Sequence, residues 1–309
     1  MDINYEYYKV FYYVAKYKNI TKAAAAMGSN QPNVTRVMKL LESMLQCKLF
    51  VREARGVVLT EEGERLYAHV KIAVSQIQNA QEELLAREMS GTGTVEIGAT
   101  ETALHLFLLD ALQGFKERYP KARIKIHNHA TPEILKNLAY GRLDFAVLTT
   151  PFELQKSFVS KELISFREVL AAGSQYQELG QGVWELRELE AYSWVGLGEG
   201  TATYELYKEF FMKNHADIGL DMEAASSDLL LPLIQNNFGI GFVPEAMAEP
   251  LVRAGSVVRV HLACGLAERK ICLVYDKGRG RSALGMKLQE YLKERQKIPG
   301  FVPIPAAEY

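Results

Sequence analysis

The sequence predicts a multidomain α/β protein with a small helical domain, a long connecting helix and a larger domain of two α/β lobes. A chain of 309 residues is too long for one ordinary hydrophobic core and indicates two or three folding units. Residues 1–60 carry nine Lys and Arg against four Asp and Glu, although the whole chain has a net charge of −1. From residue 94 onward, short apolar runs alternate with amphipathic stretches, which is typical of α/β domains. We expect three parts, residues 1–60, 61–90 and 91–309.

The composition argues against a membrane or secreted protein. Hydrophobic residues make up 48% and charged residues 24% of the chain, as in ordinary globular proteins. No apolar run approaches the roughly 18 residues that span a membrane, and the first residues lack the basic and apolar regions of a secretory signal. We therefore expect a cytoplasmic protein without a membrane partner. Cys47, Cys264 and Cys272 have no metal-ligand spacing. A redox pair of Cys264 and Cys272 is one interpretation, but two small residues in or near strands are the simpler one.

Two helices joined by a tight turn are expected within the first sixty residues. Residues 4–18 have apolar residues at helical spacing, and the alanine-rich run 22–27 favours a close-packed second helix. After a turn at 28–30, Pro32 suits the first turn of a helix over 31–45. This helix has one apolar stripe, and its opposite face carries Gln31, Asn33, Arg36 and Lys39. The arrangement predicts a helix-turn-helix, whose second helix enters the major groove of DNA.

A short hairpin and a long helix are expected next. The hairpin covers residues 51–59 and would form the wing of a winged helix-turn-helix. Thr60 suits the N-cap of a helix that continues to about Met89, before a hinge at 90–93. The apolar residues of this helix alternate four and three apart in a heptad seam, namely Leu66, Val70, Ala73, Ile77, Ala80 and Leu84. A helix between two domains needs a partner for such a seam, and we favour a copy in a second subunit over a partner in the same chain.

The remaining chain predicts two α/β lobes. The first is a βαβαβ run with strands at 94–100, 123–130 and 143–149 and helices at 103–119 and 132–140. In the second, strands are expected near 162–172, 192–197, 221–226 and 238–243, with helices near 203–214 and 228–236. Strands near 257–262 and 269–275 and a helix over 282–295 close the chain. We expect lobe I at about 91–161 and 266–309, and lobe II at about 162–265.

Five short motifs resemble those of LysR-type transcriptional regulators in order and spacing. They are Ile20-Thr21-Lys22-Ala23-Ala24, Gln31-Pro32-Asn33-Val34-Thr35-Arg36, Leu41-Glu42, Leu49-Phe50-Val51-Arg52 and Leu59-Thr60-Glu61-Glu62-Gly63. The resemblance implies a winged helix-turn-helix, a linker helix that dimerises, a periplasmic-binding-protein-like effector domain and, as the usual assembly, a tetramer. Gln46 departs from the family pattern, because a glycine usually follows the recognition helix. A left-handed conformation there costs a non-glycine residue roughly 1 kcal/mol.

The expected DNA-binding residues follow from the second helix and from the resemblance. Base edges are read by side chains with directed donors and acceptors. Gln31, Pro32 and Arg36 match the family pattern best, and Asn33 and Thr35 lie in the same half of the helix. Cations suit contact with phosphates, which orients a protein without reading sequence, and the candidates are Lys22, Lys39, Arg52 and Arg55. For any one of these residues alone, a solvated helix face is the alternative.

A small-molecule effector is expected between the two lobes. Ligands of open α/β sheets bind beyond the carboxyl ends of strands, near the N-termini of helices. This rule selects Thr100, Glu101, Thr102, Thr149, Thr150, Gly200, Thr201, Thr203, Ser226 and Ser227. Each of them is equally plausible as a cap or turn residue. Amides and hydroxyls favour an effector with a carboxylate, whereas Glu101 would repel an anion, so an amino acid or a ligand with a cationic end stays open.

Two other functional classes are weaker interpretations of the same cleft. An enzyme would need a nucleotide fingerprint, a phosphate loop or a nucleophile elbow, and the sequence has none of them. His127 and His129 share one face of a strand, but no third metal ligand is evident. A solute-binding protein would require export. We therefore expect a sequence-specific DNA-binding regulator that responds to an effector, without catalytic residues, metal or cofactor.

Overall fold

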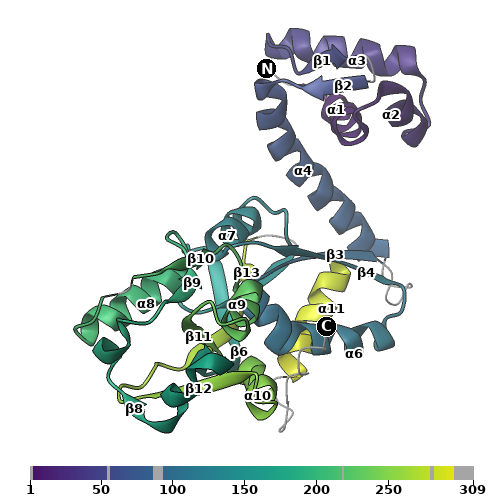
Figure 1. Ribbon diagram of the computed structural model, residues 1–309. Helices are drawn as coiled ribbons and strands as arrows, with labels where there is room; N and C mark the ends of the chain where they lie inside the picture. Colours follow the sequence, from purple (N-terminus) through teal and green to yellow (C-terminus); the bar gives the residue numbers. More distant parts are fainter. Residues whose placement is uncertain (1–2, 54–55, 86–92, 218, 279–281, 296–309) are drawn as a thin grey trace. The chain divides into compact units, whose positions relative to one another are not determined.

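The computed structural model describes residues 3–53, 56–85, 93–217, 219–278 and 282–295. By its internal contacts the chain divides into two compact units, one that runs from the N-terminus to Glu88 and one built mainly from Met89 onward. Figure 1 labels the elements of both. None of the helices in the described ranges is long and apolar enough to cross a membrane.

The first unit is a three-helix domain with a β-hairpin, followed by a long helix. Its elements are α1 (Tyr5–Tyr17), α2 (Ile20–Ala26), α3 (Gln31–Leu45), β1 (Phe50–Glu53), β2 (Gly56–Leu59) and α4 (Glu61–Leu85). The first three helices each begin after an asparagine whose side chain accepts a hydrogen bond from a backbone N–H of the first turn, namely Asn4, Asn19 and Asn30. The predicted N-cap Thr60 is also present, because its Oγ1 accepts from Gly63 N at 3.0 Å.

One hydrophobic core joins the helices of this unit. Phe11 of α1, Leu41 of α3 and Leu49 before the hairpin are almost completely buried in it. The start of α4 closes the core with Val70 and Val74. Two of the six residues of the predicted heptad seam are therefore covered by the chain's own domain, because Leu66 and Val70 pack into this core. The part of the seam that stays exposed is Ala73, Ile77 and Ala80, whereas the side chain of Leu84 lies outside the described residues.

Two backbone positions join these elements at sharp angles. Gln46 ends α3 in the left-handed conformation, with φ 54° and ψ 30°, although it is not a glycine. Gly56 begins β2 with φ +146°, and a Cβ there would lie 2.3 Å from the carbonyl oxygen of Lys18. Only glycine fits at this point, where the hairpin meets the end of α1.

The second unit contains two lobes, each built on its own sheet. Lobe I has the strand order β4-β3-β5-β13-β6, in which β3 runs parallel to β4 and β5, and β13 is antiparallel to β5 and β6. Its strands are β3 (Gly93–Ala99), β4 (Ala122–Asn128), β5 (Phe145–Thr149), β6 (Phe158–Phe166) and β13 (Arg269–Asp276). Its helical segments are α5 (Glu101–Ala103), a π-helical turn (Leu104–Leu108), α6 (Leu109–Arg118), α7 (Thr131–Ala139) and α11 (Ala283–Arg295).

Lobe II has a four-stranded sheet of order β11-β7-β12-β8 and a short parallel pair, β9 and β10. Its strands are β7 (Glu168–Gly173), β8 (Val183–Trp184), β9 (Val195–Leu197), β10 (Met222–Ala224), β11 (Ile240–Pro244) and β12 (Val257–Leu262). Its α-helices are α8 (Ala202–Lys213), α9 (Leu230–Gln235) and α10 (Glu245–Arg253), and its 3₁₀ segments are Ser174–Gln181, Leu186–Leu189 and Ser227–Leu229.

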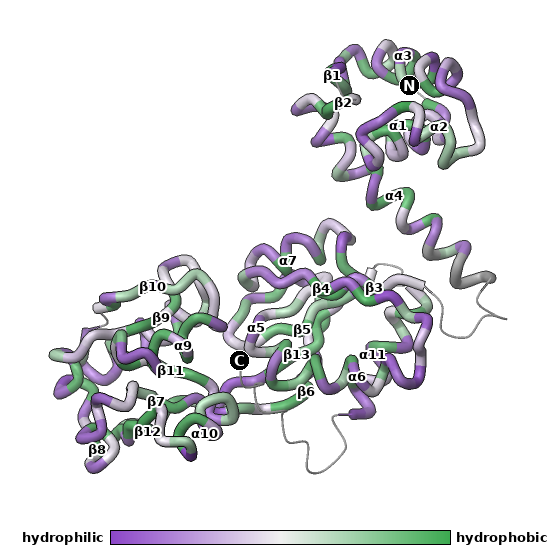
Figure 2. Tube along the Cα trace, turned by 45° about the vertical axis from the view of Figure 1, so that its right-hand side comes forward, coloured by the Kyte–Doolittle hydropathy of each residue, from purple (hydrophilic) through white to green (hydrophobic). Residues whose placement is uncertain are grey.

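Each lobe is a three-layer sandwich with the sheet in the middle. In lobe I, α6 and α11 cover one face of the sheet around Phe115 and Leu288, while α7 covers the other around Ile134 and Leu138. In lobe II, α8 packs on one side of the sheet and α9 on the other. Figure 2 shows the consequence, because β5 and β13 are hydrophobic along most of their length. Strands covered on both faces have this pattern.

The chain passes between the lobes twice. The first crossing is at Arg167, between β6 of lobe I and β7 of lobe II, and the second lies between β12 and β13. The single strand expected near 162–172 is thus two strands in different sheets. The expected change of lobe near residue 162 falls inside β6, since β6 pairs with β13 along its whole length.

Candidate functional site

The first candidate site is the exposed face of α3. Its inner side packs into the core through Val34, Val37, Met38 and Leu41. Five of the residues selected from the sequence together line one shallow hollow on the outer side, namely Gln31, Pro32, Thr35, Arg36 and Lys39. No carboxylate lines this hollow in the part of the chain that the structure describes.

Side-chain hydrogen bonds orient the polar side chains at the start of α3. Asn33 Nδ2 donates to Ser29 Oγ at 3.2 Å, and Arg36 Nη2 donates to Asn33 Oδ1 at 3.1 Å. Gln31 Oε1 accepts from the hydroxyl of Thr21 on α2 at 3.2 Å. All three bonds are exposed, so each can be exchanged for a bond to another polar surface at little cost. The outer face is thus an array of donors and acceptors on a preformed helix.

Two more of the predicted phosphate-binding residues are exposed on other elements of the same domain. Lys22 is exposed on α2, and Arg52 is exposed on β1 opposite Val57 of β2. Arg55, the remaining candidate, lies outside the described residues. The hairpin that carries Arg52 is fixed to the end of α3 by Glu42.

Glu42 is a partly buried carboxylate that links α3 to the hairpin through hydrogen bonds. Its Oε1 accepts from the backbone N–H groups of Leu49 at 2.9 Å and Phe50 at 3.3 Å, and its Oε2 lies 2.9 Å from Lys48 Nζ. Burial alone would raise the pKa of Glu42, but the hydrogen bonds from Leu49, Lys48 and Phe50 outweigh it and hold this pKa below its ordinary value. The charged carboxylate is therefore part of the folded state.

The second candidate site is a cavity of about 330 Å³ between the lobes of the second unit. Eight of the ten residues selected for an effector line it, namely Thr100, Glu101, Thr102, Thr149, Thr201, Thr203, Ser226 and Ser227. Gly200 and Thr150 do not line it. Thr150 is used by the protein itself, since its Oγ1 accepts from Lys270 N and its carbonyl oxygen accepts from Arg269 Nε.

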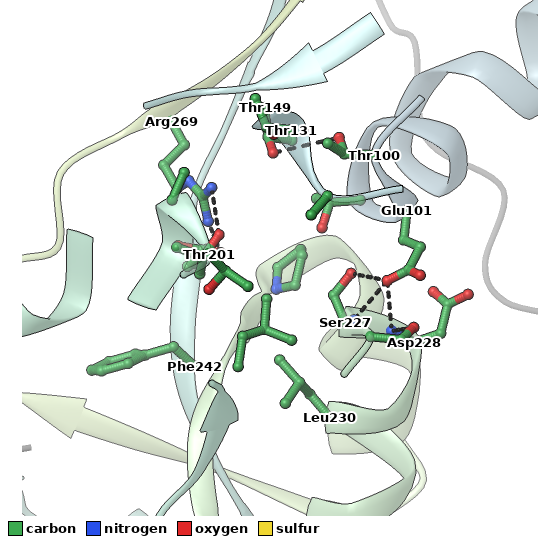
Figure 3. Close-up of a pocket in the computed structure, with 18 of the residues that line it drawn as sticks. Thr100, Glu101, Thr131, Thr149, Thr201, Ser227, Asp228, Leu230, Phe242 and Arg269 are labelled. Atoms are coloured by element: carbon green, nitrogen blue, oxygen red, sulfur yellow. Dashed lines mark hydrogen bonds and ion pairs between the residues drawn. The ribbon is translucent and has the colours of Figure 1, made fainter. Parts of the chain in front are cut away.

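Glu101 reaches across the cavity from lobe I to lobe II (Figure 3). Its Oε2 accepts hydrogen bonds from Ser227 N at 2.6 Å, Ser227 Oγ at 2.7 Å and Asp228 N at 3.4 Å. Burial opposes ionisation of Glu101, but the bonds from Ser226, Ser227 and Asp228 prevail and lower its pKa. One turn further along, His105 of the π-helical segment lies 3.0 Å from Asp228 and forms a second tie between the lobes.

A buried ion pair lies on the side of the cavity opposite Glu101 (Figure 3). Arg269 Nη1 and Glu168 Oε1 are 2.8 Å apart, and both side chains are only 5% exposed. Arg269 also donates from Nη2 to Thr203 Oγ1 at 3.1 Å. Because Arg269 begins β13 and Glu168 begins β7, the pair joins the two places where the chain crosses between lobes. Sequence reasoning missed both residues, since they lie at strand starts rather than strand ends.

The rest of the lining is mostly apolar or hydroxylic. Leu197, Leu230, Phe242 and Met247 of lobe II provide the apolar wall. Tyr207 of α8 also lines the cavity, and its helical position gave no hint of this role. From lobe I the sequence missed Asn128 at the end of β4 and the three residues after it, His129, Ala130 and Thr131. The rule that selected Thr100 and Thr149 after their strands would have found this segment had it been applied to β4.

The histidines and cysteines singled out from the sequence occupy separate places. His127 lies 3.0 Å from Glu96 and His129 lies 3.7 Å from Glu133. Cys264 packs against the lobe II core and Cys272 lies in a lobe I cluster, both as free thiols. Burial raises the pKa of each thiol, which disfavours the reactive thiolate.

Known proteins share both the sequence pattern and the fold. A family model described as the bacterial regulatory helix-turn-helix protein of the lysR family matches residues 6–64, and one described as the LysR substrate binding domain matches residues 90–297. A probable hydrogen peroxide-inducible genes activator from Streptomyces viridosporus is 26% identical over 291 residues, which cover 94% of this chain and 93% of the relative.

Two solved structures resemble the whole chain. A full-length OxyR variant from Pseudomonas aeruginosa has a TM-score of 0.70 at 16% sequence identity, over 100% of this chain and 99% of the other. Full-length CbnR, solved in complex with its target DNA, has a TM-score of 0.66 at 16% identity, over 95% and 100% of the two chains. At these identities the two structures show the shared fold. With a helix-turn-helix and an effector-binding domain both matched along its length, the chain belongs to the LysR family of bacterial transcriptional regulators.

Proposed function

We propose that this regulator binds promoter or operator DNA through the outer face of α3. The observation that carries the proposal is the hollow of Gln31, Pro32, Thr35, Arg36 and Lys39, which presents donors, acceptors and positive charge on one exposed helix face. Such a face suits the edges and phosphates of a major groove. Lys22 and Arg52, with Arg55, would add contacts to phosphates that fix the orientation without reading bases.

The interlobe cavity is proposed as the effector site. It is enclosed by both lobes, and it combines hydroxyl groups, a carboxylate and an apolar wall, as small-molecule sites do. An effector that binds both lobes would shift the population of open and closed arrangements. We propose no catalytic role for the cavity, since the family's members act as regulators.

Self-association is proposed through α4, with a dimer or tetramer as the assembly. The exposed line of Ala73, Ile77 and Ala80 is the part of the heptad seam that the domain's own core leaves uncovered. Two copies joined there would present paired helix-turn-helix domains to a partly symmetric DNA site. As a DNA-binding regulator, the protein would act in the cytoplasm.

The first test is selection of genomic DNA fragments by the purified full chain at moderate salt, followed by sequencing of the retained DNA. We expect enrichment of a few intergenic sites that share a two-fold motif. The matched control is Arg36→Ala, which removes one exposed side chain and should lose the enrichment. Weak retention of all fragments, or of none, would contradict the proposed role of α3.

A further inference from the structure

The interlobe cavity has more negative than positive charge on its walls. Three carboxylates line it, from Glu101, Glu168 and Asp228, against the single guanidinium of Arg269, among the residues that the structure describes. The charge of Arg269 is already balanced, because its Nη1 lies 2.8 Å from Glu168 Oε1 in a pair that is 5% exposed on both sides. His129, the imidazole of the lining, faces Glu133 at 3.7 Å. An entering anion would find no uncompensated guanidinium or ammonium group there.

The position that would suit an anion is occupied by the protein itself. Glu101 Oε2 takes the N–H and hydroxyl groups of Ser227 at 2.6 and 2.7 Å and the N–H of Asp228 at 3.4 Å. An effector carboxylate would have to displace Glu101 and leave two carboxylates close together. Two carboxylates in contact repel each other strongly, which disfavours the charged form of both. The hydroxyls and amides that suggested a carboxylate ligand from the sequence therefore serve an internal carboxylate.

A buried hydroxyl in the same cavity lies beside Glu168 and Arg269 but forms no hydrogen bond of good geometry. Tyr207 is 6% exposed, and its Oη has no partner with hydrogen-bond geometry within the described ranges. Burial raises its pKa well above the ordinary value, and the charge of Glu168 acts in the same direction, so the phenol stays protonated. A buried polar group without a partner costs about 1–3 kcal/mol. This unmatched hydroxyl, which is independent of the charge count, points to a ligand atom beside it.

The carboxylates of the cavity are suited to a donor-rich ligand. Oε2 of Glu101 and Oε1 of Glu168 accept hydrogen bonds from within the protein, and both carboxylates line the cavity, where a donor-rich ligand can reach them. Leu230 and Phe242 lie along another wall in Figure 3 and can cover a short carbon chain. The cavity, at about 330 Å³, is at the small end of the range for ligand sites.

We propose that the effector is a small organic cation with an ammonium or guanidinium group at each end of a short carbon chain. One group is bound by Glu101, the other by Glu168 and Tyr207 on the opposite wall, and the chain lies against Leu230 and Phe242. The inference rests on the proposed function in one respect, that the interlobe cavity is the effector site. It replaces a carboxylate with a cation as the expected recognition element.

The test is calorimetric titration of the full-length chain with four probes that share a four-carbon chain. These are 1,4-diaminobutane and agmatine as cations, 1,4-butanediol as the neutral analogue and succinate as the dianion. We expect at least one cation to bind with millimolar or tighter affinity, and at least tenfold more tightly than the diol or succinate. Tighter or equal binding of succinate, or no binding of either cation at millimolar concentration, would overturn the proposal.

Three variants locate the binding. Glu101→Gln and Tyr207→Phe should each weaken cation binding about tenfold, because each removes one polar contact with one of the two charged groups. Tyr207→Phe should leave the melting temperature of the ligand-free chain unchanged or raise it, since it deletes an unmatched buried hydroxyl. Glu209→Gln is the control, because Glu209 lies on the same helix but is exposed and paired with Lys213. Equal cation affinity in all three variants would show that the cation binds elsewhere, and the proposal would fail.

The same preparation separates this inference from the proposed function. If genomic sites are enriched but the cations do not bind, only the effector class is wrong. If the cations bind in the cavity but no DNA is enriched, the DNA-binding role of α3 fails while the cavity assignment stands.

Discussion

Arg36 and Arg52 are both exposed arginines of the first unit, and we expect them to contribute to DNA binding in different ways. Arg36 lies on the face of α3 that should meet base edges. Arg36→Ala should therefore weaken the free energy of binding to the cognate site by about 1–3 kcal/mol and change binding to other sequences little. Arg52 lies on the hairpin, so Arg52→Ala should weaken binding to all DNA sequences alike. It should also reduce the slope of log affinity against log salt concentration by about 1. Fluorescence anisotropy with cognate and scrambled duplexes at several salt concentrations measures both. An unchanged affinity of Arg36→Ala for the cognate duplex would contradict this assignment.

Glu42 provides the charge that fixes the hairpin beside α3, and its effect depends on pH. Because its pKa is lower in the folded state than in the unfolded chain, the charged carboxylate stabilises the fold above the unfolded pKa, about 4.3. That stabilisation is lost as the pH falls through the lower folded value.

Glu42→Gln should therefore reduce the free energy of unfolding of the first unit by about 1–2 kcal/mol at pH 7. The difference from the parent chain should shrink as the pH falls below 4, where the parent's carboxylate also becomes protonated. Amide hydrogen exchange within α3 and β1, measured at both pH values, reports this unit alone. A difference that persists unchanged at low pH would show that the charge of Glu42 is irrelevant.

At the scale of secondary structure, the end of α3 carries a measurable strain. Gln46 holds φ 54°, a conformation that costs a residue with a Cβ roughly 1 kcal/mol relative to glycine. Gln46→Gly should raise the free energy of unfolding of the first unit by about 0.5–1 kcal/mol. Ser43→Gly is the matched control, because it places glycine within the same helix and should lower stability by roughly 0.5 kcal/mol. Stabilisation by both variants, or by neither, in amide exchange of α3 would contradict the argument.

Elements with a strong local pattern were predictable from the sequence. The helix-turn-helix, the hairpin, Thr60 as N-cap and the parallel βαβαβ run of lobe I all follow from periodicity, caps and turns within short windows. The split of residues 158–173 into β6 and β7 was not predictable, because the polar Arg167 interrupts one extended stretch without a glycine or proline. The change of sheet there depends on pairing with β13, more than a hundred residues later.

The candidate sites show the same limit. The residues of α3 were found because they share one helix, so their spacing alone places them together. Glu101 was selected for its position after a strand, but its partner Ser227 is 126 residues away, and nothing local reveals that the two meet. The pair of Glu168 and Arg269 spans 101 residues and joins two strand starts, which the strand-end rule does not consider.

At the scale of the assembled molecule, Ile77 is the residue that tests the proposed association of α4 with a second copy. It is 41% exposed on a helix whose first two seam residues, Leu66 and Val70, pack into the core of their own domain. If two copies bury it, Ile77→Arg should weaken self-association by about 3 kcal/mol, roughly a hundredfold, since each subunit loses an apolar contact and gains a charge. Gln78→Arg, at the exposed neighbouring position, should have little effect. Sedimentation equilibrium measures both, and an unaltered assembly in Ile77→Arg would place the interface elsewhere.

The double crossing between the lobes has a kinematic consequence. A body attached at two points turns about the line through both, so the relative motion of the lobes reduces to one angle. Glu168 and Arg269 begin the strands at those two crossings, close to the axis, and their separation changes little as the angle opens. Glu101 and Ser227 meet on the opposite side of the cavity, where the lever arm is longer and the same rotation produces the larger displacement. Rotation about this line would open the cavity as a wedge, with the Glu168–Arg269 pair at its narrow end and Glu101 at its wide end.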